Sequence, residues 1–496
     1  MGRRKIPRHI DAPPLELSEA EMRDLLDRAG EAVIRHVASL PSQPTHAVKG
    51  GLKIARSLRE PIPERGAPVE RLLRTLFGKA IPQSLNTASP GYLAYVPGGG
   101  LFPAAVADFV ALATNRYTGM WLAAPALVQL EQNVLEWLCR LLGLPGGAGG
   151  LLTSGGSMAN LLALVAARRD RLPPEFQRGV VYTSDQAHHS VLKAALFAGI
   201  LPERVRSLPA DSMFRLDLSA LREAVDRDVR EGLSPFLVVA SAGTTNTGAI
   251  DDLRGIGAFA RERGLWFHVD AAYGGFFALT ERGRRALAGI ELADSVTLDP
   301  HKGLFLPYGT GCLVMRDPGT LRRACSVPAS YMPPMQEEEG RVDYCEMGPE
   351  LSREARGLRV WLPLRMFGAA AFRAALDEKL DLAARAEEGL SAIPEIEIVA
   401  RRELSLLAFR PRAEDGEDEA SLESRTRAML QAVNEKQRVF LSGARSGGRF
   451  FARVCVLSFR THADRIEALI EDVREAVRPA GARGRSRSSP RLDEKR

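Results

Sequence analysis

Cysteine is scarce and scattered in this sequence. Its five cysteines stand far apart, and no two of them form a CxxC pair. That spacing argues against a zinc ribbon and a disulfide framework, and it favours a reducing, cytoplasmic compartment. We expect no metal site. No apolar run approaches the roughly 18 residues that a membrane span needs. The basic start of the chain is followed by no apolar segment, so we expect neither a secretory signal nor a membrane partner.

An excess of positive charge is also absent from the body of the chain, although the net charge is +6. Residues 1–9 carry four positive charges and residues 478–496 a net five, which leaves the remainder at −3. The body therefore gives no reason to expect a nucleic-acid partner. The tail has almost no apolar residue to bury, so we expect a disordered, solvating segment over 479–496. A basic arm that binds RNA stays open as the alternative for this tail.

The pattern of apolar residues predicts an α/β protein with four parts. Short β-rich runs alternate with helical stretches from about residue 91 to 370, which is typical of βα units around a mostly parallel sheet. We expect these runs to be strands at Val180–Thr183, Phe236–Ala240, Trp266–Val269, Ser295–Leu298 and Gly311–Met315. Before them, residues 1–90 read as a helical arm without a core of its own. After them, residues 371–478 read as a small α+β domain with strands at Ile396–Val399, Leu404–Arg410, Arg438–Leu441 and Phe450–Phe459.

A lysine follows one of these strands directly. Residues 295–303 read SVTLDPHKG, so a short apolar run leads into His301 and Lys302. A lysine held at a strand end in a cleft loses hydration, which lowers its pKa and makes the amine a nucleophile for imine formation. By itself, Lys302 could equally be an ordinary surface residue.

An aspartate ends another apolar run. Residues 265–275 read LWFHVDAAYGG, in which Asp270 closes the run and Ala272 follows it. A carboxylate in that position is costly unless it meets a cation. The protonated pyridine nitrogen of pyridoxal 5'-phosphate (PLP) is such a cation. Taken alone, Asp270 could also cap a helix.

Small and hydroxyl-bearing residues stand at the ends of other strands. The run LTSGGSMAN holds Gly156 and Ser157 just before a helical stretch, where backbone N–H groups can cradle a phosphate. The run DQAHHS offers the flat imidazole of His188 for stacking on a ring, and SAGTTNTG places Thr245 in a hydroxyl cluster. Each of these motifs by itself is equally compatible with a tight loop or a structural histidine.

The order of the motifs is specific even though each one is weak. With DQAH, HVDAAY and DPHK in succession, the chain resembles the fold-type I PLP enzymes. Within them it resembles the group II amino-acid decarboxylases, in particular the aromatic-L-amino-acid (DOPA) decarboxylases, from about Gly91 to Trp361. The resemblance implies a large domain with a seven-stranded, mostly parallel sheet, a homodimer, and PLP as the cofactor.

The resemblance also implies roles for individual residues. Lys302 would bind the cofactor covalently, and Asp270 would pair with its ring nitrogen. His188 and Ala272 would pack on the two faces of the ring. The phosphate would be held by Gly156, Ser157 and His301, with Thr245 nearby. Residues 327–350 are rich in Pro, Gly and Glu and are expected to form a mobile loop. Its Tyr344 is the candidate acid for returning a proton to the substrate, with an ordinary loop tyrosine as the alternative.

Some positions depart from the family pattern. Val96 stands where the aromatic decarboxylases usually carry Phe, Gly119 precedes Met120 and Trp121 in place of an aromatic residue, and Gln129 replaces an acid. An aromatic clamp on the substrate is therefore thinned, which leaves the side chain of the substrate open.

We therefore expect PLP-dependent α-decarboxylation of an L-amino acid to its amine and CO2. The alternative within PLP chemistry is transamination or an aldehyde-forming oxidative deamination. A rival of another class is an RNA-binding or regulatory protein that keeps the fold without turnover, but the intact set of Lys302, Asp270 and His188 argues against a dead scaffold.

Overall fold

The structure is a computed structural model that describes residues 15–327, 330 and 340–478. It divides into two compact units, residues 1–86 and 87–496, each of which is described by itself. The expected tail at 479–496 and the basic residues at the start of the chain lie outside the described residues. Among the described helices, none combines the length with the apolar character that crossing a membrane requires.

The first unit is helical. Its α-helices are α1 (Glu19–Ser39), α2 (Gly51–Ser57) and α3 (Val69–Thr75). Ser18 and Glu21 form a capping box that fixes the start of α1. Helix α1 has no buried residue, and Leu25 and Leu26 are 39% and 46% exposed. The unit therefore leaves the apolar side chains of its longest helix uncovered.

The second unit contains a seven-stranded sheet with the strand order β1-β7-β6-β5-β4-β2-β3. Only β7 runs against its neighbours, so the sheet is mostly parallel, as predicted. The strands are β1 (Gly149–Thr153), β2 (Gly179–Ser184), β3 (Val205–Leu208), β4 (Ser234–Ser241), β5 (Trp266–Asp270), β6 (Ser295–Leu298) and β7 (Gly311–Met315). Strands β2 and β4 to β7 lie where the β-rich runs predicted them. The prediction missed β1, because its two glycines hide a strand that pairs with β7, and it missed the short edge strand β3, which pairs with β2.

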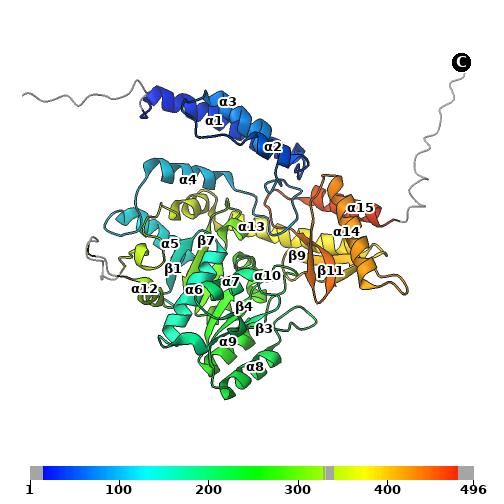
Figure 1. Cartoon of the computed structure of the whole chain (residues 1–496). Helices are drawn as coiled ribbons and strands as arrows, with labels where there is room; N and C mark the ends of the chain where they lie inside the picture. Colours follow the sequence, from blue (N-terminus) through cyan, green and yellow to red (C-terminus); the bar gives the residue numbers. More distant parts are fainter. Residues whose placement is uncertain (1–14, 328–329, 331–339, 479–496) are drawn as a thin grey trace, which may run out of the picture. The chain divides into compact units, whose positions relative to one another are not determined.

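Two helices precede β1, and from there on helices alternate with the strands along the chain (Figure 1). They are α4 (Phe102–Thr114), α5 (Pro125–Leu141), α6 (Gly156–Arg171), α7 (His189–Phe197), α8 (Leu218–Arg230), α9 (Leu253–Arg263), α10 (Glu281–Ala286), α11 (Pro300–Gly303) and α12 (Gly319–Cys325). Helix α6 runs along β4 to β7, whereas α8 and α9 lie against β3, β4 and β5. The strands between them are apolar and buried, which is typical of a parallel sheet. Ligands bind such sheets at the carboxyl ends of the strands.

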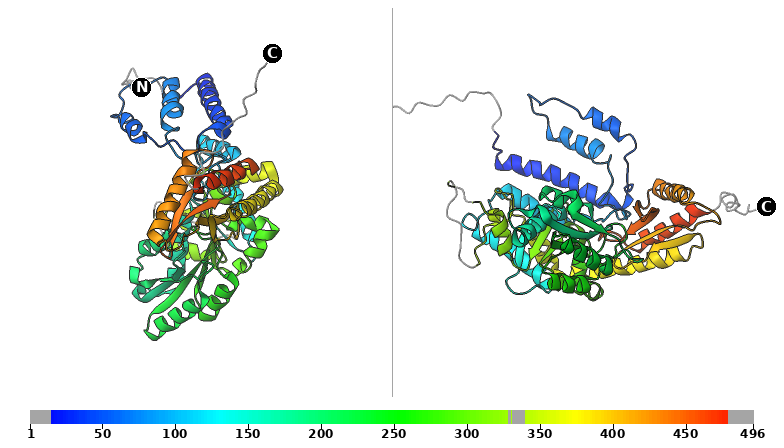
Figure 2. Two further views of the ribbon diagram at one scale, coloured as in Figure 1. Left: turned by 90° about the vertical axis from the view of Figure 1, so that its right-hand side faces the viewer. Right: turned by 60° about the horizontal axis from the view of Figure 1, so that its bottom comes forward.

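Helix α13 (Gly357–Ser391) leads from the large sheet to a smaller one and breaks at Gly368, which has a φ of 72°. The small antiparallel sheet has the order β10-β11-β9-β8. Its strands are β8 (Ile396–Ala400), β9 (Leu406–Pro411), β10 (Ser442–Ser446) and β11 (Arg449–Cys455), and its helices are α14 (Glu419–Glu435) and α15 (Ala463–Val477). Figure 2 shows α14 and α15 side by side on this sheet.

The strand predicted at Arg438–Leu441 is wrong, since the strand of this region is β10, which begins at Ser442. The apolar residues of the predicted run are used in another way. Phe440 forms an isolated parallel bridge with Tyr92, and its backbone bonds to Gly91 and Leu93. The chain before the large domain is thereby tied to the small sheet.

Candidate active site

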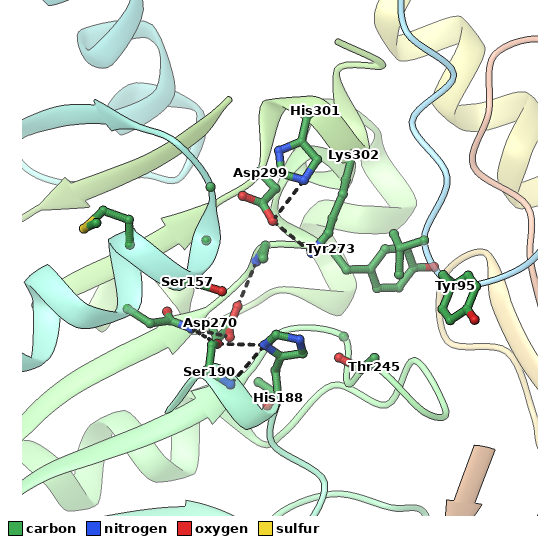
Figure 3. A pocket seen from close by; sticks show the side chains of 18 of the residues that line it. Tyr95, Ser157, His188, Ser190, Thr245, Asp270, Tyr273, Asp299, His301 and Lys302 are labelled. Carbon is green, nitrogen blue, oxygen red and sulfur yellow. Dashed lines mark hydrogen bonds and ion pairs between the residues drawn. The ribbon is translucent and has the colours of Figure 1, made fainter. Parts of the chain in front are cut away.

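A cavity of about 460 Å³ opens at the carboxyl ends of β4, β5 and β6 (Figure 3). Its size suits a small-molecule ligand. All the residues that the sequence proposed for cofactor binding line it: Gly156, Ser157, His188, Thr245, Asp270, Ala272, His301 and Lys302. They come from loops and helix starts that follow different strands, and only the packing of the sheet brings them together.

Lys302 enters the cavity from the short helix α11, directly after β6. Its Nζ lies 2.9 Å from Oδ2 of Asp299. Burial opposes the charge on the amine, but the carboxylate of Asp299 outweighs it, so the pKa of Lys302 is raised. The expectation of a lowered pKa is therefore wrong for the cofactor-free chain, because it did not take the neighbouring acid into account.

Asp270 ends β5 and faces the cavity with a fixed carboxylate. Its Oδ2 accepts a hydrogen bond from Nδ2 of Asn160 at 2.9 Å, and its Oδ1 accepts one from the backbone N–H of Ala272 at 3.1 Å. The amide oxygen of Asn160 is held in turn by His268 at 3.0 Å and Thr297 at 2.7 Å. Burial lowers the pKa of His268 to about 4, so the ring is neutral and donates from Nε2. This network fixes the orientation of Asp270.

His188 stands at the N-cap of α7, where its Nδ1 accepts a hydrogen bond from the backbone of Ser190 at 3.3 Å. The hydroxyl of Ser190 lies 2.7 Å from the same nitrogen. Burial lowers the pKa of His188, so the imidazole is neutral. A neutral, fixed and flat ring at the cavity wall is suited to stacking on an aromatic cofactor.

The start of α6 supplies a cradle for an anion. A Cβ atom at Gly156 would lie 3.1 Å from Oδ2 of Asp299 and 3.3 Å from Cβ of Ala272, so any larger residue would crowd the side chains of the site. Helix α6 has 16 residues, and its first N–H groups, with the hydroxyl of Ser157, are oriented for a phosphate. His301 lies beside the start of this helix, since a Cβ atom at Gly155 would be 3.8 Å from its ring, and its Nδ1 is held by the carbonyl of Thr310 at 2.7 Å.

These features fit PLP. The cavity offers an amine for its aldehyde, a carboxylate for its ring nitrogen, a flat imidazole for its face and a helix start for its phosphate. One further observation favours a polar ligand in this cavity. Oδ1 of Asp299 is buried and has no hydrogen-bond partner among the described residues.

Tyr344 lies elsewhere. It does not line the cavity, and it is only 1% exposed. The guanidinium of Arg353 lies 4.5 Å from its ring centre, and its hydroxyl has no partner in the described part of the chain. The structure therefore does not place the candidate acid, Tyr344, beside Lys302, because this ring packs in the core. Much of the predicted loop, with the other tyrosine of the stretch, Tyr331, lies outside the described residues.

Several residues of the cavity carry no prediction from the sequence. Asp299 stands three residues before Lys302, and Asn160 stands four residues after Gly156, so both lie inside the predicted motifs. Their spacing of about one helical turn from a predicted site residue is the signal that could have found them. The rings of Tyr95 and Tyr308 also line the cavity. Nothing local marks Tyr95, since it reaches the cavity through contacts with the small sheet.

Comparison with known proteins agrees with this geometry. Residues 53–412 match the pyridoxal-dependent decarboxylase conserved domain. The chain is 34% identical over 467 residues to the aromatic-L-amino-acid decarboxylase of Bacillus atrophaeus, covering 92% of this chain and 97% of that one. It is 31% identical over 412 residues to the phenylacetaldehyde synthase of Arabidopsis thaliana, covering 80% and 84%.

The fold agrees as well. The crystal structure of Oryza sativa TDC with PLP and tryptamine superposes with a TM-score of 0.88 at 28% identity, covering 94% of this chain and 99% of that one. The chain belongs to the family of pyridoxal-dependent decarboxylases. It is a PLP-dependent carboxy-lyase of the amino-acid decarboxylase type, which confirms the predicted fold, cofactor and reaction class.

Proposed function

We propose that the substrate is an aromatic L-amino acid, which is decarboxylated to the corresponding amine. The observation that carries this proposal is the pair of rings, Tyr95 and Tyr308, in the same cavity as Lys302. They are 56% and 60% exposed, so both rings are available to a substrate side chain. The names of the relatives support an aromatic substrate, and the losses at Val96 and Gly119 do not remove these two rings.

The roles proposed for the cavity residues follow from their contacts. Lys302 would hold the cofactor covalently through its amine, which would be free while the substrate is bound and would bind the cofactor again when the product leaves. Asp270, fixed by Asn160, keeps a proton on the ring nitrogen. His188 and Ala272 pack on the two faces of the ring.

The phosphate is held at the other end of the cofactor. Gly156, Ser157 and His301 bind it, with Thr245 nearby. Bound PLP supplies an electron sink for the bond between Cα and the carboxylate. The protein would contribute by orienting the substrate in the cavity and by excluding water. Tyr344 has no part in this proposal.

A second candidate is an aldehyde-forming oxidative deamination, since a phenylacetaldehyde synthase is among the relatives. That reaction would consume O2 and water and release the aldehyde, CO2, ammonia and hydrogen peroxide, whereas decarboxylation releases CO2 and the amine. Transamination would release a keto acid and no CO2.

The test is a screen of the common amino acids for CO2 release, followed by product mass and peroxide assay. We expect amine from tryptophan, tyrosine or phenylalanine without peroxide. Formation of aldehyde and peroxide would show that the reaction is oxidative deamination and not decarboxylation to the amine. Turnover of only non-aromatic amino acids would refute the proposed substrate class. Borohydride reduction of the loaded protein should place the pyridoxyl group on Lys302. Labelling of another lysine would refute the site.

We further propose a homodimer in the cytoplasm. The uncovered apolar side chains of α1 support a second copy as partner. The five cysteines are all free thiols, which supports a reducing compartment. Light scattering on the purified protein tests the dimer, and a fully active single chain would contradict it.

A further inference from the structure

Tyr95 has an uncommon backbone. Its φ is 53°, in the left-handed region that favours glycine and that costs other residues free energy. Its ring lines the active-site cavity and is 56% exposed, so burial of the ring does not repay that cost. Figure 3 shows the ring on the side of the cavity away from Asp270. Something other than ring packing must hold the backbone in this conformation.

Two side chains of the small sheet hold it. The backbone N–H of Tyr95 donates to Oγ of Ser442 at 3.1 Å, and its carbonyl accepts from Nη2 of Arg453 at 3.0 Å. Nη1 of Arg453 lies 3.4 Å from the same Oγ, so the two side chains form one unit. Ser442 starts β10 and Arg453 lies on β11, opposite each other in the register of the two strands. Both polar groups of the strained residue are thus bound from the small sheet.

Burial of Arg453 at this position costs free energy. It is 3% exposed, and it makes no ion pair within the part of the chain that the structure describes. Its Nε has no hydrogen-bond partner there either. A buried guanidinium without a carboxylate costs stability. Its hydrogen bonds go to the backbone of Tyr95, a cavity residue, and to Oγ of Ser442.

The segment around Tyr95 joins the small sheet to the lysine turn. On one side, Leu93 bonds to Phe440 and Cys455 through the backbone. On the other side, Gly98 packs so closely that a Cβ atom there would lie 1.8 Å from the carbonyl oxygen of His301. The ring of Tyr95 is therefore held at a defined place relative to Lys302 by contacts that lie outside the cavity.

We propose that Ser442 and Arg453 are positioning residues that hold Tyr95 in its left-handed conformation and thereby set the preference of the pocket for an aromatic side chain. The inference rests on the proposed function, and it deepens that function by adding residues of the small sheet that touch neither substrate nor cofactor.

The test is a double-mutant cycle with Ser442→Ala, Arg453→Met and Tyr95→Gly. KM for the best aromatic substrate should rise about tenfold in Ser442→Ala and in Arg453→Met, as for loss of a pocket contact. The value of kcat should stay within about twofold, because the groups around Lys302 are unchanged. In the Tyr95→Gly background, adding Ser442→Ala should change KM by less than about twofold, since glycine needs no clamp and carries no ring.

Arg410→Met is the matched control. Arg410 is also buried in the small sheet, on β9, but it pairs with Glu397 and Glu419. Its loss should lower the melting temperature and leave KM unchanged. Should Arg453→Met fail to fold, Ser442→Ala, which removes a single atom, carries the test.

A crystal structure of Ser442→Ala gives a readout independent of turnover, because φ at position 95 should leave the left-handed region. An unchanged KM in folded Ser442→Ala, or an equal rise in KM in the Tyr95→Gly background, would overturn the inference. If the wild type accepts only non-aromatic amino acids, the substrate proposal fails. The preference for an aromatic side chain fails with it, whereas the φ at position 95 still decides the clamp.

Discussion

Two ion pairs near the large sheet have similar N–O distances but differ in their exposure to a cavity. The pocket pair, Asp299 and Lys302, has an N–O distance of 2.9 Å, and the lysine side chain is 23% exposed to the cavity. The buried pair, Glu131 and Arg353, has a distance of 2.8 Å, and both side chains are 1% exposed. Access to a cavity, rather than the pairing of charges, separates a group that can react from one that can only support the fold.

The partners of the two pairs teach the same lesson. In the buried pair, one carboxylate oxygen of Glu131 also accepts from the backbone N–H of Leu152, and Arg353 donates to the carbonyl of that residue. The pair therefore ties α5 and the segment before α13 to β1. Both pairs leave a carboxylate oxygen without a partner among the described residues, Oδ1 of Asp299 and Oε2 of Glu131. The buried pair binds the backbone of β1, whereas the pocket pair lines a cavity in which a ligand can reach it.

The largest effect is expected in the pocket pair. Lys302→Ala should lower activity by at least about 10⁴-fold, because the covalent anchor and the exchangeable amine are both lost. The melting temperature should change little. Lys193→Ala, on the exposed face of α7, is the control and should keep full activity. Residual activity above a hundredth of the parent's would show that another group performs this role.

The buried pair should respond in stability instead. Glu131→Gln leaves the guanidinium of Arg353 buried without its counter-charge, so the free energy of unfolding should fall by about 3–5 kcal/mol. Activity per folded molecule should stay close to that of the parent at low temperature. Adding Arg353→Met should restore much of the stability. If Glu131→Gln instead lowered kcat without lowering the melting temperature, the two pairs would not differ in the way described.

Asp270→Asn tests the second charge of the cavity. The amide keeps the shape but loses the charge that stabilises a protonated ring nitrogen, so turnover should fall by about 100-fold or more. PLP should remain bound, as measured by its visible absorbance. Asp294→Asn is the control, because this acid lies before β6, at the other end of the strand from the cavity, and binds the backbone of Phe267. Near-normal activity of Asp270→Asn would mean that another residue holds the ring nitrogen.

The smallest effect is expected at Tyr344. Its hydroxyl is buried without a described partner, and burial raises the pKa of the phenol well above its ordinary value. Tyr344→Phe removes only that hydroxyl, so kcat should stay within about twofold and stability should be unchanged or slightly higher. The ratio of amine to aldehyde in the product is the decisive measurement. A shift toward aldehyde would show that the phenol reaches the substrate after all.

Local sequence is informative where strands end. The runs Trp266–Val269 and Ser295–Leu298 are short and mostly apolar. Each is followed by an aspartate, Asp270 or Asp299, which is costly to bury without a partner. A parallel sheet places such residues at one edge, so the motifs alone assign Asp270 and Lys302 to one site. Gly156 and Ser157 are recognisable for the same reason.

Local sequence is misleading where long-range packing decides. The Pro-, Gly- and Glu-rich stretch around Tyr344 has the composition of an exposed loop. The ring of Tyr344 is nevertheless buried, and the guanidinium of Arg353 packs over it. The acid that raises the pKa of Lys302 is visible in the chain at Asp299, but its distance from the amine depends on the turn of α11. Strand β10 begins four residues later than predicted, because the apolar Phe440 pairs with Tyr92 and does not belong to the strand.

The sequence by itself determined the class of the fold, because strand periodicity is a local property of the chain. Its ordered motifs indicated the cofactor and the residues proposed to hold it, through their resemblance to a known family. Only the tertiary structure decided which charged groups open into a cavity and which are sealed. Only the tertiary structure placed Tyr95, whose backbone is held by Ser442 and Arg453 from nearly the other end of the chain. The reason is physical: the conformation of a strained residue depends on the partners of its backbone, and the fold alone chooses those partners.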